Sequence, residues 1–261
     1  MTIDGTTQPG ATPGGASFPA NVDSSLAIQI SGSALLGADD DGLSIVTGAD
    51  GTEIRGLSFT DFTGSSSEAI VIWASSNNLL AGNHFGVDAT GLVAAANRLH
   101  LYVGSTSTGN RIGGTAAADR NLFSASTSAA IMLDGDGVIG TIVQGNDFGL
   151  LGDGSAGSTG WYAIAANGTS TGAIGGTAAG AGNRFANGLA ASRRLATPPS
   201  RRSATRSGPT RSPASTSRGT VRRPTTPRTS TQAPTTCSTS RCRPVRMPAP
   251  RPSRSLRRAR R

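Results

Sequence analysis

The 261-residue sequence predicts an all-β protein: a parallel β-helix (solenoid) of about nine coils over residues 1–190, followed by a disordered tail over residues 191–261. Three observations support this fold. One block of sequence occurs twice, short apolar runs alternate with turn-forming residues, and the composition changes abruptly near residue 190. Each observation concerns a different part of the chain, and together they divide it into a folded body and a tail.

The repeated block is the most informative of the three. Residues 81–91 return as residues 144–154, and residues 112–117 return as residues 174–179, about 63 positions later. Such a repeat is typical of one structural unit stacked on copies of itself. Divided into three coils of roughly 21 residues, the block suits a parallel β-helix, whose coils lie about 4.8 Å apart.

Short apolar runs predict the strands. Each run is too short for a helix and is bounded by Gly, Asn, Asp or Ser, which favour tight turns. The runs lie at residues 26–28, 43–46, 54–59, 69–73, 79–80, 101–103, 112, 122–123, 131–133, 141–143, 164, 174 and 184–185. No window has a helical period or approaches the roughly 18 apolar residues of a membrane span, so we expect no such span.

Four asparagines recur at equivalent positions of the repeat. They are Asn83, Asn121, Asn146 and Asn183, three of them preceded by Gly and one by Arg120. Asn tolerates a left-handed backbone and can hydrogen-bond a neighbouring main chain. We therefore interpret them as a structural turn ladder along the stack, in preference to a ligand-binding role.

Several motifs together resemble a known family. They are Thr2-Ile-Asp-Gly-Thr-Thr-Gln-Pro-Gly10, Ile54-Arg-Gly-Leu57, the repeated Gly-Asn-x-Phe-Gly with a following Asp and Gly, and Ile-Gly-Gly-Thr followed by Arg120-Asn121 or Gly182-Asn183. This combination resembles bacterial right-handed parallel β-helix repeat proteins of the pectin-lyase-like superfamily over most of residues 1–190. The resemblance implies right-handed coils and a secreted or cell-surface protein, and many members of the family have no assigned activity. The first residues of this chain show no signal peptide.

The charge of the chain divides at the end of the body. Residues 1–192 hold five arginines against fifteen acidic residues, a net charge of −10, whereas residues 193–261 hold nineteen arginines and no acidic residue. An authentic tail of this kind would be disordered and would bind nucleic acid through its arginines. Nucleic-acid binding is therefore one alternative function.

We favour a different origin for the tail. Arg with Pro, Ala, Ser and Thr and without Lys is what GC-rich DNA encodes in a wrong reading frame. In the alternative frame, residues 204–210, 214–217 and 237–242 can be read as Gly-Asn-Ala-Ile-Trp-Ala-Asn, Gly-Ile-Asp-Leu and Leu-Leu-Asp-Phe-Pro-Val, which match the family pattern. The hypothesis places a frameshift near residues 187–193. On this reading Cys237 and Cys242 have no redox or metal-binding role.

Enzymatic motifs of the resembled family are missing from the body. It lacks the hydrolases' Asn-Thr-Asp, paired Asp-Asp with Gly-His-Gly, and Arg-Ile-Lys, and its two histidines, His84 and His100, stand apart. Asp88 and Asp153 recur at the same loop of the repeat and are interpreted as loop caps, since an acid and a base need different environments. We lean towards a protein that is not an enzyme; the remnant of a polysaccharide lyase, hydrolase or epimerase is the alternative.

Two acidic runs are the candidates for a metal site. Residues 39–41 are three consecutive aspartates, and Asp134 and Asp136 flank a glycine. Ca²⁺ needs about six to eight oxygens in suitable geometry, and neither run matches a known calcium loop. We expect turns or solvated loops here and no cofactor, with Ca²⁺ as the less favoured alternative.

Three aromatic residues are candidates for stacking on sugar rings: Trp73, Trp161 and Tyr162. Packing at an edge of the coil stack is the competing and favoured interpretation of each. Within these limits, the leading function is a structural, adhesive or glycan-binding β-helix whose partner is a polysaccharide or cell-surface glycan. Open ends of the stack would expose strand edges, so we expect poor solubility.

Overall fold

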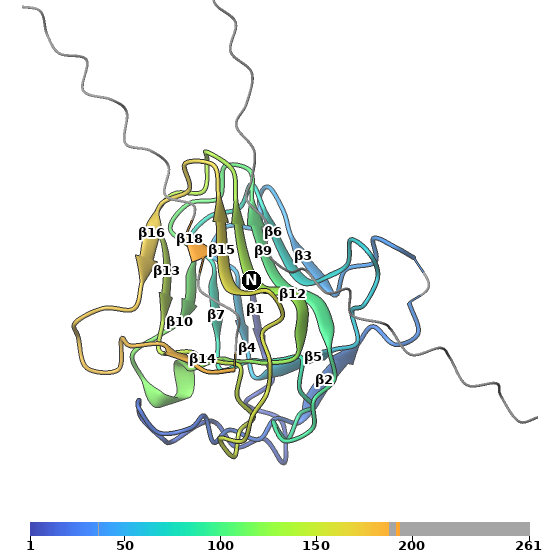
Figure 1. Ribbon diagram of the computed structural model, residues 1–261, viewed down its shortest axis with the longest axis vertical. Helices are drawn as coiled ribbons and strands as arrows, with labels where there is room; N and C mark the ends of the chain where they lie inside the picture. The colour runs from blue at the N-terminus through green and yellow to red at the C-terminus, as the bar shows by residue number, and fades with distance from the viewer. Residues whose placement is uncertain (36, 188–191, 194–261) are drawn as a thin grey trace, which may run out of the picture. The chain divides into compact units, whose positions relative to one another are not determined.

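The computed structural model describes residues 1–35, 37–187 and 192–193, and these residues form an all-β fold (Figure 1). Helical structure in this part of the chain is limited to η1, a 3-10 helix at Ala117–Asp119. The predicted all-β class is confirmed. The predicted tail lies outside the described residues apart from the backbone of residues 192–193, and so do Cys237, Cys242 and most of the proposed out-of-frame region.

The strands form three sheets of six strands, and all neighbours within a sheet are parallel. Sheet 1 contains β1 (Thr2–Asp4), β4 (Glu53–Arg55), β7 (Leu79–Ala81), β10 (Arg111–Gly113), β13 (Thr141–Gln144) and β16 (Gly172–Ile174). Sheet 2 contains β2 (Ile28–Ser31), β5 (Leu57–Thr60), β8 (His84–Phe85), β11 (Leu122–Phe123), β14 (Asp147–Phe148) and β17 (Arg184–Phe185). Sheet 3 contains β3 (Leu43–Ile45), β6 (Glu68–Trp73), β9 (Asn97–Gly104), β12 (Ser126–Asp134), β15 (Tyr162–Asn167) and β18 (Ser192–Arg193).

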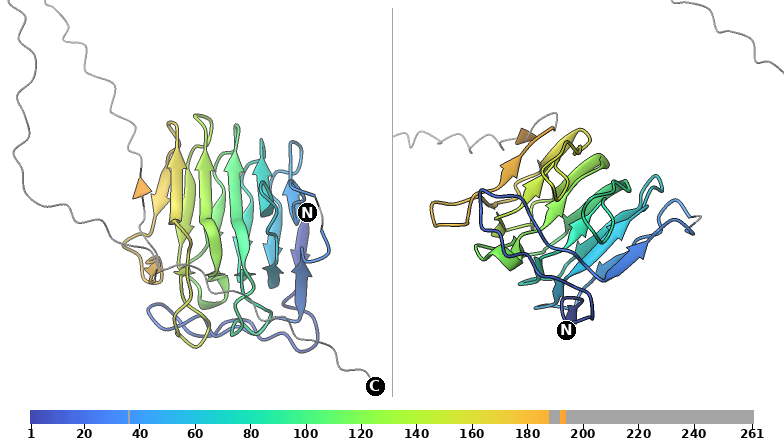
Figure 2. Two further views of the ribbon diagram at one scale, coloured as in Figure 1. Left: turned by 45° about the vertical axis from the view of Figure 1, so that its right-hand side comes forward. Right: turned by 90° about the horizontal axis from the view of Figure 1, so that it is seen from below.

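The chain visits the three sheets in turn and then returns to the first, one strand further along (Figure 2). Three consecutive strands therefore make one coil, and each strand pairs with the strands three before and three after it. This connectivity is consistent with a parallel β-helix.

The predicted coil length and coil number are wrong. The described residues form six coils rather than about nine. Leu79 pairs with Arg111 and Arg111 pairs with Ile142, so one coil takes 32 or 31 residues, and the 63-residue repeat spans two coils. Long loops explain the difference: the third and fifth coils carry one between sheets 2 and 3, and the fourth and sixth carry one between sheets 1 and 2.

A row of aromatic rings runs through the core on the inner side of sheet 2. The rings of Phe59, Phe85, Phe123, Phe148 and Phe185 are stacked with successive centroids 5.2, 4.7, 4.9 and 4.9 Å apart. These distances are close to the spacing between strands, so each coil contributes one ring to a continuous stack. Aliphatic side chains from sheets 1 and 3 fill the rest of the interior.

The structure places the four predicted asparagines in one hydrogen-bonded row at the corner between sheets 1 and 2. The backbone N–H groups of Asn83, Asn121 and Asn146 each donate to the side-chain oxygen of the asparagine in the next coil, over 2.8, 3.1 and 2.9 Å. The side-chain Nδ2 groups donate to carbonyls of the preceding coil, as Asn121 does to Leu80 over 2.9 Å. The row thereby pairs buried backbone groups that the corner takes out of the sheets.

A second, shorter row lies at the corner between sheets 3 and 1, and the sequence did not reveal it. The backbone N–H of Thr52 donates to Oδ1 of Asn78 over 2.8 Å, and the N–H of Asn78 donates to Oδ1 of Asn110 over 2.9 Å. Both asparagines are buried. The same physical requirement, pairing of buried backbone at a corner, thus selects Asn twice.

The connection from β1 to β2 contains a strap, defined as residues 11–26, that crosses the outer side of sheet 2 (blue in Figure 2). Val22 of the strap packs in a small apolar cluster with Val87 and Leu122. Its backbone reaches the last coil, because Arg184 Nη1 donates to the carbonyl of Pro19 over 3.2 Å. The strap therefore covers the outer side of sheet 2 from solvent.

Candidate functional site

Two exposed rings stack on each other on the outer side of sheet 3. Trp73, at the end of β6, and Tyr102, on β9, have centroids 6.1 Å apart and planes inclined by 16°. Trp73 remains 48% exposed in spite of this contact. The two residues form a flat, half-open aromatic surface, which we call the aromatic platform.

Gly104 makes room for the platform. It is the register partner of Trp73 in sheet 3, and a Cβ added to it would lie 2.9 Å from Trp73 and 2.4 Å from Tyr102. Real Cβ atoms do not make such short contacts with carbon, so a side chain at position 104 would displace both rings. The glycine lets the indole lie across the strand instead of standing away from it.

Polar groups border the platform on the neighbouring coil. The Tyr102 hydroxyl donates to Oδ2 of Asp134 over 2.8 Å. Burial, followed by this hydrogen bond and the charge of Asp134, raises the pKa of Tyr102 to about 12. Asn167, the partner of Asp134 in β15, is exposed. Carboxylate and amide groups thus lie beside the rings and can bond hydroxyls of a bound molecule.

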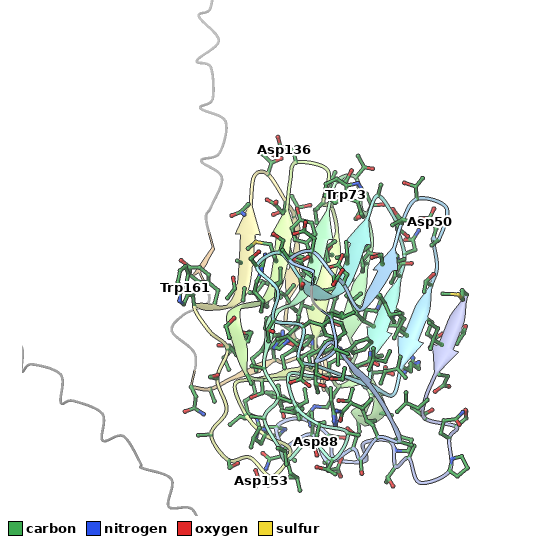
Figure 3. All side chains as sticks on the ribbon, turned by 90° about the vertical axis from the view of Figure 1, so that its right-hand side faces the viewer. Asp50, Trp73, Asp88, Asp136, Asp153 and Trp161 are labelled. Atoms are coloured by element: carbon green, nitrogen blue, oxygen red, sulfur yellow. The ribbon has the colours of Figure 1, made fainter. Side chains whose placement is uncertain are left out.

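The other two predicted aromatic candidates lie elsewhere. Trp161 is 68% exposed, precedes β15, and donates its backbone N–H to the carbonyl of Ser128 over 2.8 Å. Tyr162 begins β15 and pairs with Ala129, whereas Trp73 ends its strand. Figure 3 shows Trp161 well apart from Trp73. The structure brings Trp73 together with Tyr102, which the sequence prediction did not single out.

A titratable cluster lies at the beginning of the same sheet. Glu68 Oε1 is 3.3 Å from Arg98 Nη2, and the Glu68 backbone N–H donates to Oδ1 of Asp41 over 2.9 Å. Burial raises the pKa of Glu68 to about 7, the carboxylates of Asp41 and Asp39 raise it further, and Arg98 opposes the shift. Glu68 is therefore a carboxyl group that is partly protonated near neutral pH.

The acidic runs considered for Ca²⁺ are bonded to the protein. Asp40 accepts the N–H of Gly37 over 2.7 Å, and Asp136 accepts both the N–H and the hydroxyl of Thr169. The bonds from Thr169 lower the pKa of Asp136. Among the residues that the structure describes, no group of three or more His, Cys, Asp or Glu side chains is arranged to hold a metal ion.

Asp88 and Asp153 lie at the opposite end of the strands from Trp73 (Figure 3). Asp88 accepts the backbone N–H groups of Leu92 and Val93, each over 3.1 Å, and Asp153 accepts the N–H of Ser155 over 2.8 Å. The bonds from Ser155 lower the pKa of Asp153. Each carboxylate therefore bonds the backbone of its own loop.

Both histidines are buried and neutral. His84 Nε2 is 2.8 Å from the hydroxyl of Ser24 in the strap, and its Nδ1 is 3.2 Å from the carbonyl of Asp88. Burial lowers the pKa of His84 to about 4 and that of His100 to about 3. The Ser24–His84 pair resembles a nucleophile and its base, but both side chains are covered. Its position fits a bond that fastens the strap to sheet 2.

A small hollow of about 150 Å³ lies beside the first two coils of sheet 3, lined by residues that include Phe62, Asp40 and Ser67. Pockets for small molecules usually measure about 300–1,000 Å³. The hollow is too small for an enclosed ligand of that size, so the open outer side of sheet 3 is the better candidate for recognition.

Comparison with known proteins gives no relative: no family model, curated protein or solved structure matches this chain. Within the described residues, none of the helical structure has the length and apolar character needed to span a membrane.

Proposed function

We propose that this protein is a non-enzymatic, right-handed parallel β-helix that binds a polysaccharide or cell-surface glycan through the outer side of sheet 3. We place it with the secreted or cell-surface proteins of the pectin-lyase-like superfamily, on the sequence motifs given above. The observation that carries the proposal is the aromatic platform of Trp73 and Tyr102, half exposed and bordered by Asp134.

Sugar rings suit such a surface. The C–H faces of a pyranose are apolar and pack on aromatic rings, while its hydroxyls need hydrogen-bond partners at the edge of the contact. Trp73 offers the apolar area, and Asp134 and Asn167 offer an acceptor and an amide on the neighbouring coils. A flat, open sheet suits a long polymer, which needs no enclosed pocket.

Glycan binding by two single-residue variants tests the proposal. A panel of neutral and acidic polysaccharides is screened by affinity electrophoresis, and the best ligand is titrated by calorimetry. Trp73→Ala removes most of the apolar contact and should weaken binding at least tenfold, about 1.4 kcal/mol or more.

Trp161→Ala is the matched control, because it removes an equally large and more exposed ring away from the platform. Its affinity should equal that of the unchanged protein. Equal losses in the two variants, or binding that Trp73→Ala leaves intact, would contradict the platform as the binding surface.

One observation favours an enzymatic alternative, the remnant of a polysaccharide lyase, hydrolase or epimerase. Glu68 has the raised pKa of a general acid, and Asp41 supplies a second carboxylate on the same side of sheet 3. If this alternative holds, acidic or neutral polysaccharides will gain reducing ends or unsaturated uronate absorbance, and Glu68→Gln will abolish the change.

Nucleic-acid binding by the arginine-rich tail falls on residues outside the described structure. Removal of residues 193–261 tests it, because binding that survives the deletion cannot depend on the tail. Nucleotide sequence across residues 185–200 tests the frameshift hypothesis separately.

A further inference from the structure

The last coil presents uncovered core positions at its free edge. Ile174 of β16 is 54% exposed and Phe185 of β17 is 45% exposed. Their register partners one coil earlier, Val143 and Phe148, are completely buried. The difference arises because a coil lies on only one side of Ile174 and Phe185 within the described residues. The edge therefore has the side chains of an interior coil and the exposure of a surface.

The first coil presents the opposite edge in a similar state. Ile3 of β1 and Ile30 of β2 pack against the core but are only partly buried. Their register partners in the second coil, Ile54 and Phe59, are 1% and 0% exposed. At both ends, therefore, apolar side chains that point along the stack lack the neighbour that interior coils provide.

The free edge of β1 also has unpaired backbone groups. The carbonyl of Met1 accepts the N–H of Glu53, and the N–H of Gly5 donates to the carbonyl of Arg55. Because backbone groups alternate along a strand, the N–H and C=O of Thr2 point away from β4, towards the free edge. On β17 the N–H groups of Arg184 and Ala186 bond β14, so the N–H of Phe185 points towards the opposite edge.

We propose that the free edge of the sixth coil binds the free edge of the first coil of a second copy, so that copies stack head to tail into a filament. The register gives the contacts directly. Continued by one strand, sheet 1 places Ile174 on the second copy's Ile3, and sheet 2 places Phe185 on its Ile30. The contact extends sheets that already exist and needs no new kind of interaction.

Polarity selects the head-to-tail arrangement over a two-fold dimer. Translation along the stack keeps every strand parallel to its new neighbour and keeps each sheet on its own kind. A two-fold axis across the stack would make the strands antiparallel and would reverse the order of the sheets around the axis. At most one sheet would then meet its own kind, and Phe185 would lose its matching apolar neighbour. A head-to-tail contact does not close, so it continues into a filament.

Two complementary variants test the proposal in the full-length chain. Phe185→Lys places a charge on the edge of the sixth coil, and Ile3→Lys places one on the edge of the first coil. Val93→Lys is the control, because Val93 is 60% exposed on the loop between β8 and β9. Sedimentation velocity and electron microscopy give the mass and shape of the particles, and circular dichroism shows that each variant is folded.

The unchanged protein and Val93→Lys should form filaments that lengthen with concentration, and each edge variant alone should be monomeric. An equimolar mixture of the two edge variants retains one free edge of each kind and should stop at dimers, twice the monomer mass. Where Ile3→Lys disturbs folding, Thr2→Pro blocks the first edge by removing its outward N–H; Ile174→Lys is the second block for the sixth coil.

Three results would overturn the proposal. Dimers of Ile3→Lys alone would indicate pairing of two sixth coils, and dimers of Phe185→Lys alone would indicate pairing of two first coils. A monomeric unchanged protein at high concentration would show that neither edge binds, and amorphous aggregates in all variants would show that association does not depend on these edges.

Discussion

The Asp147 carboxylate is completely buried and bonds three groups from distant parts of the chain. Its oxygens lie 2.8 Å from Arg120 Nη2 and 2.6 Å from Arg184 Nη2, and one of them accepts the N–H of Val22 over 3.1 Å. Arg120 is itself almost fully buried and donates to the carbonyl of Ala16 over 2.8 Å. This carboxylate joins the fourth, fifth and sixth coils to the strap.

Asp147→Asn should destabilise the protein by about 3 kcal/mol or more, because Arg120 would keep its buried charge and lose its counter-charge. Denaturant unfolding followed by circular dichroism measures the change. Asp39→Asn, on an exposed loop, removes the same charge and should change stability by less than about 0.5 kcal/mol. Similar values for the two variants would show that the buried network contributes little.

The two buried histidines predict sensitivity to acid. Because burial lowers the pKa values of His84 and His100 to about 4 and about 3, the unfolded chain binds more protons than the folded chain below about pH 6.5. Stability should therefore fall as the pH decreases from about 6.5 towards 4, by up to about 1.4 kcal/mol per pH unit for each histidine. Melting curves at several pH values measure this slope, and it should flatten in His84→Gln.

Glu68 acts in the opposite direction. Its pKa in the folded protein is raised above the unfolded value, so its contribution favours the folded state at low pH and is lost as the pH rises towards 7. A slope in His84→Gln as steep as that of the unchanged protein would show that the His84 imidazole does not control acid stability.

At the scale of elements, the asparagine row replaces hydrogen bonds that each corner would otherwise leave unmade. Asn121 is central in this row: its side chain accepts from Asn83 and donates to Leu80. Asn121→Ala would leave the buried N–H of Asn83 and the buried carbonyl of Leu80 unpaired. Unfolding free energies should show a loss of about 2 kcal/mol or more.

Asn167→Ala serves as the control, because Asn167 is exposed and its Nδ2 makes only a weak 3.5 Å contact with Met132 Sδ. A small effect of Asn121→Ala, equal to that of Asn167→Ala, would mean that water or backbone relaxation satisfies the corner.

Periodic features were predictable from the sequence, and features outside the period were not. The four asparagines and the phenylalanine of each Gly-Asn-x-Phe-Gly recur because every coil needs the same corner and core contact. The coil length was not predictable from the repeat alone, since loops alternate between two corners and the repeat therefore measures a pair of coils. With the correct length, Trp73 and Gly104 would have been recognised as neighbours, and Tyr102 with them.

At the scale of the whole molecule, the strap changes the usual behaviour of a solenoid. In most repeat proteins each unit contacts only its neighbours, and unfolding can begin at an end. Here the strap follows the first strand and bonds the last coil, through Arg184 and Pro19. No repeat predicts such contacts, because the strap occurs once and its partners lie up to 165 residues away.

Hydrogen exchange tests this coupling. The Val22 amide in the strap and the Arg184 and Ala186 amides in the last coil should show similar protection, and all three should lose it together in Asp147→Asn. Rapid exchange at Val22 beside continued protection of the last coil would show that the strap opens independently. Asp39→Asn, which should not disturb the strap, gives the reference pattern.

The strap also limits how the stack can grow. A segment of fixed length that begins at the first coil and must still reach the sixth acts as a ruler for the number of coils. Gain or loss of one 63-residue unit would move Arg184 by two strand spacings, about 9.6 Å, and take it out of hydrogen-bonding reach of Pro19. Duplication would therefore require a matching change in the strap, so this connection preserves a particular length in a fold that otherwise permits many.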